Sequence, residues 1–135
     1  MENKHILNWF RFADTVLAAV EHLLSMRPLP YEIICFHCQQ SVEKYLKGYL
    51  IYKGIEQPPK IHDLAELCNK CADFNSQFDN ILKKCDFLSD FGVQPRYPDE
   101  IEMNENIMRK SVQYAKEIKE FSPLATVCQQ LEKNA

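Results

Sequence analysis

The stretch that decides the fold reads Phe36-His37-Cys38-Gln39-Gln40-Ser41-Val42-Glu43-Lys44-Tyr45-Leu46-Lys47. It lies within residues 30–53, a run without internal proline that is long enough for about six helical turns. When side chains are placed at about 100° per residue, one narrow face has the apolar spacing of a buried helix. This face consists of Cys35, Cys38, Val42, Tyr45, Leu46 and Tyr49.

A row of polar side chains follows the edge of that buried face. It consists of Gln39, Gln40, Glu43 and Lys47, whereas Lys44 and His37 point further away. Each side chain in the row needs a hydrogen-bond partner, because burying polar groups unpaired costs free energy. Glu43 and Lys47 are four residues apart, in the order that favours an ion pair. The row therefore indicates either contacts between packed helices or one edge of a binding site.

The rest of the sequence predicts further helices and no strand. Apolar residues recur at helical spacing in residues 4–25, 64–73, 76–90 and 99–121, with a further short helix at 124–131. Stiff, proline-containing linkers are predicted at 55–61 and 93–98. Asp63 and Asp99 suit the N-cap position, and Gly54 suits the left-handed residue that ends a helix. We expect an all-α, up-and-down bundle of four to five helices, with one domain at 1–121 and a C-terminal tail at 122–135.

Composition excludes several classes of protein. The 135 residues suffice for one domain, and 46% of them are hydrophobic. The net charge is −3 and no basic run is present, which disfavours a DNA-binding protein. No apolar stretch approaches the roughly 20 residues of a membrane span, and the N-terminus lacks a signal peptide. We therefore expect a soluble, cytoplasmic protein without a membrane partner.

Six cysteines raise the question of metal binding. Cys35 and Cys38 form one C-x-x-C pair, and Cys68 and Cys71 form another, a pattern compatible with a zinc site. Both pairs fall inside predicted helices on their apolar faces, without the turn residues that a four-thiolate site needs. The prediction is buried free thiols that act as small hydrophobic residues, with no metal, no disulfide and no cofactor.

Three short motifs in order resemble the small prokaryotic HEPN-domain proteins. The first motif is Cys35 together with the stretch quoted above, which gives residues 35–47. The second is His62-Asp63-Leu64, and the third is Arg96-Tyr97-Pro98. The resemblance covers about residues 8–121. It implies a bundle of about five helices, a homodimer, and partnership with a separately encoded minimal nucleotidyltransferase in a toxin-antitoxin-like module. Each motif alone is weak, whereas the three together are specific.

The resemblance does not extend to the RNase activity of many family members. Their motif is an Arg followed about four to six residues later by a His, which acts as acid and base while the Arg holds the phosphate. The histidines here are at positions 5, 22, 37 and 62, and the arginines at 11, 27, 96 and 109, so no pair has that spacing. We predict no catalytic residues and favour binding of a nucleotide or other phosphorylated ligand.

The predicted ligand-binding residues are Gln40, Glu43, Lys47, His62, Arg96 and Tyr97. His62 precedes a helix N-terminus, where backbone donors favour an anion, but it could equally lock the linker by a hydrogen bond. Arg96 could hold a phosphate or pair with an acidic neighbour. Tyr97 could stack on a base or pack against the bundle. Two alternatives stay open: an RNase that uses His62 or His37 with Arg96, and a purely structural helical partner.

Overall fold

The computed structural model describes residues 2–91 and 103–135, and these ranges contain helices and no strand. The two longest helices are α1 (Glu2–Leu23) and α2 (Tyr31–Tyr52). They are followed by α3 (Leu64–Ala72), a 3-10 helix η1 (Ser76–Ile81), α4 (Leu82–Ser89), α5 (Glu105–Glu120) and α6 (Ser122–Lys133). The predicted all-α fold class is confirmed.

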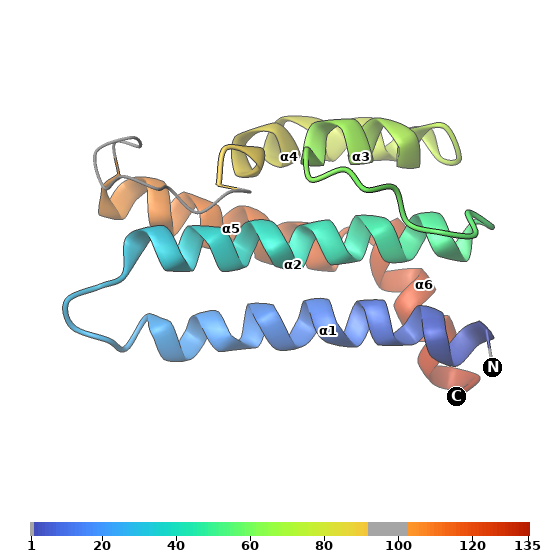
Figure 1. Cartoon of the computed structure of the whole chain (residues 1–135), viewed down its shortest axis with the longest axis horizontal. Coiled ribbons are helices and arrows are strands. Elements are labelled where there is room, and N and C mark those ends of the chain that lie inside the picture. The colour runs from blue at the N-terminus through green and yellow to red at the C-terminus, as the bar shows by residue number, and fades with distance from the viewer. Residues whose placement is uncertain (1, 92–102) are drawn as a thin grey trace.

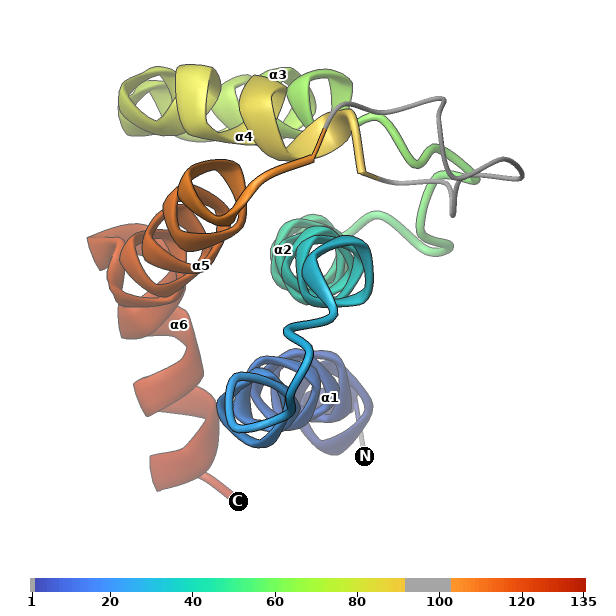
Figure 2. The same cartoon turned by 90° about the vertical axis from the view of Figure 1, so that its left-hand side faces the viewer.

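Helix α2 is the centre of the bundle. Figure 1 shows α1 lying antiparallel along one side of α2, and the α3–α4 pair on the opposite side. The end-on view in Figure 2 places α5 against a third side, with α6 descending from α5 towards α1. Accordingly, α2 contacts α1, α3, α4, α5 and α6. The helix that carries the motif is therefore covered along most of its length, and 13 of its residues are buried.

The predicted apolar face of α2 is buried as expected. Its six side chains, Cys35, Cys38, Val42, Tyr45, Leu46 and Tyr49, are each at most 2% exposed. Burying an apolar side chain of this size stabilises the fold by about 1.5–3 kcal/mol. The face packs on residues from the other helices, among them Phe10 of α1, Phe78 of η1 and Ile118 of α5.

Glycine at position 48 sets the close packing of α1 on α2. A Cβ atom at Gly48 would lie 3.0 Å from Trp9 Cβ and 3.1 Å from Phe10 Cε2. These distances are tighter than ordinary van der Waals contacts, so an added side chain would require Trp9 or Phe10 to shift. Gly54, which follows α2, has φ of 103°, so the predicted left-handed position after the helix is confirmed.

Two predicted helices have different bounds in the structure. The segment predicted as one helix at 76–90 is η1 followed by α4, with Asn75 accepting from the Gln77 N–H at η1. The helix predicted from 99 begins instead at Glu105, because Asn104 has an extended backbone and its side chain accepts from the Ile107 N–H at 2.9 Å. The predicted cap at Asp99 lies outside the described residues.

The C-terminal segment forms a helix, as predicted for residues 124–131, and that helix is packed. In α6, Pro123 occupies the first turn, where its missing N–H costs nothing. Leu124, Val127 and Leu131 are buried, and α6 contacts α1, α2 and α5. The hydrophobic core therefore continues past residue 121.

The two C-x-x-C pairs lie inside helices, in α2 and α3, and all four thiols are buried. Burial raises the pKa of the Cys35 thiol to about 11, and burial likewise raises that of Cys71. At neutral pH Cys35 and Cys71 are therefore protonated, weakly polar core residues. A membrane span requires a helix that is both long and apolar, and no helix in the described part of the chain meets both requirements.

Candidate functional site

Glu43 of α2 is the centre of a buried polar cluster. Its Oε2 lies 3.2 Å from Lys47 Nζ and 3.6 Å from Lys44 Nζ. Its Oε1 lies 3.1 Å from His62 Nδ1 and accepts from Gln39 Nε2 at 3.2 Å. The side chains of Glu43 and Lys47 are each only 7% exposed. One buried carboxylate therefore binds three side chains of its own helix and one from the linker.

Helix geometry explains why these side chains meet. Gln39, Glu43 and Lys47 are spaced at four residues, so they lie above one another on one face of α2. The linker at 53–63 runs back along α2 before α3 begins (Figure 1). Gln39 Nε2 also donates to the His62 backbone oxygen at 3.2 Å, which holds the linker at this level of the helix.

The start of α3 fixes His62 from the other side. Asp63 is the N-cap, and its Oδ1 accepts from Ala65 N–H at 2.9 Å and from Glu66 N–H at 3.2 Å. Ser89 of α4 donates to the same oxygen at 3.1 Å and accepts from the Leu64 N–H at 2.7 Å. The predicted cap is therefore confirmed, and it anchors the residue next to His62 in the bundle.

The electrostatics favour the ionised form of Glu43. Burial alone would raise the pKa of this carboxyl, but it is outweighed by hydrogen bonds from His62 and Gln39 and by the Lys47 ammonium. The pKa of Glu43 consequently lies below its ordinary value of 4.5. At neutral pH, Glu43 carries one negative charge against the positive charges of Lys44 and Lys47.

Beside the cluster lies an open pocket of about 360 Å³, lined by Lys47, Gln57, Pro58, Pro59, Lys60 and His62. We call it the Lys47 pocket. The His62 side chain is 70% exposed, so its ring faces solvent while Nδ1 contacts Glu43. Lys47 is buried and still borders this space. The pocket thus has cationic groups at its wall and the Glu43 carboxylate behind them.

The structure brings together three of the six predicted site residues: Glu43, Lys47 and His62. Gln40 is half-buried, and within the described part of the chain no hydrogen bond joins it to the cluster. Its predicted place is taken by Gln39, whose side chain reaches both Glu43 and His62. Four-residue spacing from Glu43 was the signal for Gln39. Arg96 and Tyr97 lie outside the described residues.

Lys44 differs from its predicted orientation. It was expected to point away from the polar row, but Lys44 Nζ lies 3.6 Å from Glu43 Oε2. Its ammonium also sits 5.5 Å from the centre of the Trp9 ring and 5.9 Å from that of Phe12. Packing of α1 against α2 causes this, because the aromatic rings of α1 attract the cation towards the seam between the helices. The long aliphatic stem of Lys44 lets its ammonium group reach this position.

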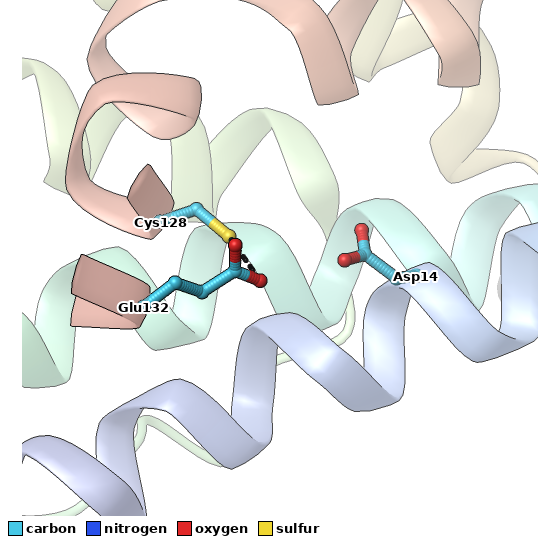
Figure 3. A group of neighbouring side chains, drawn as sticks. All are labelled: Asp14, Cys128 and Glu132. Carbon is cyan, nitrogen blue, oxygen red and sulfur yellow. Dashed lines mark hydrogen bonds between the residues drawn. The ribbon is translucent and has the colours of Figure 1, made fainter. Parts of the chain in front are cut away.

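A second group of polar residues lies between α1 and α6. Asp14, Cys128 and Glu132 each place one ligand atom within 4.8 Å of the others (Figure 3). Asp14 is already satisfied by the Tyr45 hydroxyl and by Lys119 Nζ at 3.7 Å. The Cys128 thiol points to Glu132 Oε1 at 3.9 Å. Burial and the nearby carboxylates raise the pKa of Cys128 to about 11, so protein contacts account for this group without a metal.

The chain is similar to a known protein family. The family model described as the HEPN domain matches residues 6–124. This range includes most of α1, all of α2 to α5 and every residue of the Glu43 cluster. Neither a curated protein nor a solved structure was found to be similar to the chain.

Proposed function

Because this chain belongs to the HEPN domain family, we propose that it is a helical binding protein whose Lys47 pocket takes a nucleotide or other phosphorylated ligand. The observation that carries this proposal is the buried Lys47. Its ammonium is held 3.2 Å from Glu43 and also borders an open pocket with Lys60 and His62. A cation fixed in this way loses little side-chain entropy on binding an anion, which favours affinity.

The charges around the pocket support an anionic ligand. Lys44, Lys47 and Lys60 supply three positive charges, and Glu43 returns one negative charge. The Asp63 carboxylate is engaged by the N-terminus of α3 and by Ser89. With Asp63 counted as well, the five side chains carry a net charge of +1, from three lysines and two carboxylates, which favours an anionic ligand. The donor set of ammonium and imidazole groups suits phosphate oxygens, which accept charge-assisted hydrogen bonds.

A thermal-shift titration tests the proposal. A nucleoside phosphate at about 100 times its Kd adds roughly 2.7 kcal/mol of stability, which raises the melting temperature. We expect Lys60→Ala to reduce this shift with little effect on the unliganded protein, because Lys60 is exposed. Lys83→Ala, an exposed lysine of α4, is the matched control and keeps the full shift. No shift with any member of a nucleotide panel, or equal shifts in wild type and Lys60→Ala, contradicts the proposal.

A homodimer, a minimal nucleotidyltransferase partner and a toxin-antitoxin-like role form part of the same proposal. The support for these three features is the family resemblance, because related proteins commonly have them. Light scattering on the purified chain measures the dimer directly. Co-expression with a minimal nucleotidyltransferase followed by affinity capture tests the partner. A monomer at all concentrations, or a partner that never co-purifies, removes the corresponding part.

A second candidate function, RNA cleavage, is favoured by one contact. Glu43 accepts at 3.1 Å from His62 Nδ1, a carboxylate–imidazole pair of the kind that orients a general acid or base. The other ring nitrogen belongs to a side chain that is 70% exposed. This reading predicts that purified protein degrades RNA and that His62→Gln abolishes the activity, whereas His22→Gln on α1 does not. Absence of cleavage by wild type, or equal cleavage by the His62 variant, refutes it.

A further inference from the structure

We infer that the aromatic pocket beside Lys44 is the second half of the same site and binds the aromatic ring of a ligand whose phosphate occupies the Lys47 pocket. This inference rests on the proposed function and names the class of ligand: a planar aromatic group joined to a phosphate, as in a mononucleotide. It adds Trp9, Phe12 and Lys44 to the binding residues.

The aromatic pocket is a separate hollow on the surface, of about 380 Å³. It is lined by His5, Asn8, Trp9 and Phe12 of α1 and by Lys44 of α2. Its size falls within the range of pockets that hold small organic ligands. Phe12 is 54% exposed, so a large part of its ring is open to a ligand. A planar ligand that covered this ring would remove apolar surface from water.

Glu43 connects the two pockets. Lys44 Nζ and Lys47 Nζ lie 3.6 and 3.2 Å from the same carboxylate oxygen, so the two nitrogens are separated by no more than those two distances together. The Trp9 ring centre lies a further 5.5 Å from Lys44 Nζ. A base, a ribose and one or two phosphates can bridge this span. One ligand can therefore contact the rings and the Lys47 pocket at once.

The backbone holds the aromatic side in place. Trp9 approaches α2 at Gly48, where an added Cβ would lie 3.0 Å from Trp9 Cβ. Lys44 and Gly48 are one helical turn apart, so Trp9 and the Lys44 ammonium share one face of α2. In this arrangement Lys44 lies between the rings and Glu43, where it can contact a base by a cation–π interaction or a phosphate by charge.

Tryptophan fluorescence provides a direct test, because Trp9 is the single tryptophan of the chain. Adenosine monophosphate and ribose 5-phosphate are the probes, since they share the phosphate and sugar and differ in the base. We expect the first to quench Trp9 fluorescence and to bind about 10-fold more tightly, which lies within the range that one stacked base provides. Phe12→Ala should remove about tenfold of the affinity for adenosine monophosphate and leave that for ribose 5-phosphate unchanged.

The outcomes separate this inference from the proposed function. Phe74→Ala is the matched control, because Phe74 is 44% exposed and lines neither pocket. Equal affinities for the two probes with unchanged Trp9 fluorescence overturn the aromatic subsite and leave the phosphate site standing. Equal losses in Phe12→Ala and Phe74→Ala also overturn the subsite. Failure of both probes to bind overturns the proposed function and this inference together.

Discussion

Replacing Glu43 by Gln should destabilise the protein far more than the same change at Glu117. Both residues have a glutamine and a lysine partner, and Glu43 has Lys44 and His62 in addition. Glu43 accepts from Gln39 and pairs with Lys47 at 3.2 Å, and Glu117 accepts from Gln113 and pairs with Lys84 at 3.0 Å. They differ in exposure, since the Glu43 side chain is 7% exposed and the Glu117 side chain 40%. The comparison therefore contrasts a buried carboxylate that has four partners with a more exposed one that has two.

The expected magnitude follows from the charge that is left behind. Glutamine keeps one acceptor oxygen, but it leaves the buried Lys47 ammonium without a counter-charge. Removing one partner of a buried ion pair costs about 3–5 kcal/mol. Because Lys47 borders the open Lys47 pocket, water can reach it, and we expect about 3 kcal/mol at Glu43. At Glu117 the expected cost is within about 1 kcal/mol, as for other surface pairs.

Urea unfolding followed by far-UV circular dichroism measures both variants. The double variant Glu43→Gln/Lys47→Met is the decisive addition. It removes the stranded charge, so its stability should recover to within about 1 kcal/mol of wild type. If Glu43→Gln costs no more than Glu117→Gln, burial of the cluster does not control its energetics and the reasoning is refuted. If the double variant is less stable than Glu43→Gln, the stranded charge is not the cause.

Three further predictions concern acid stability, helix packing and capping. The pKa of Glu43 in the folded protein is below 4.5, so the ionised carboxylate contributes fully to stability above pH 4.5 and loses this contribution as the pH falls through the folded-state pKa. The difference in urea midpoint between wild type and Glu43→Gln should therefore shrink in acid. A difference that stays constant with pH contradicts this prediction. Gly48→Ala should destabilise by about 1–3 kcal/mol despite the better helix propensity of alanine, because the new Cβ lies 3.0 Å from Trp9 Cβ; a rise in melting temperature contradicts it. Asp63→Ala should cost about 1 kcal/mol through loss of the α3 cap, whereas an unchanged urea midpoint refutes a capping role.

Local patterns were sufficient to predict much of the fold. Apolar spacing and proline positions predicted the course of α1, α2 and α3, because these signals depend on neighbours within one or two turns. The cap at Asp63 and the left-handed Gly54 also follow from residues adjacent in sequence. The start of α5 was missed, because Asn104 and the acidic residues before it are competing caps that the sequence does not rank.

The candidate site, like the fold, was predicted in part from local spacing and depends in part on tertiary packing. Four-residue spacing alone predicted that Glu43 and Lys47 pair, and a helical wheel placed them on a buried edge. Four-residue spacing also favoured Gln39 over Gln40 as a partner of Glu43, but the sequence could not show that the returning linker would bind Gln39 through the His62 backbone oxygen. Nor could it place Lys44, whose position depends on two rings of another helix. Periodicity fixes the face of a helix, whereas the partners on that face come from segments far away in the chain, and their approach is set only when the whole bundle packs.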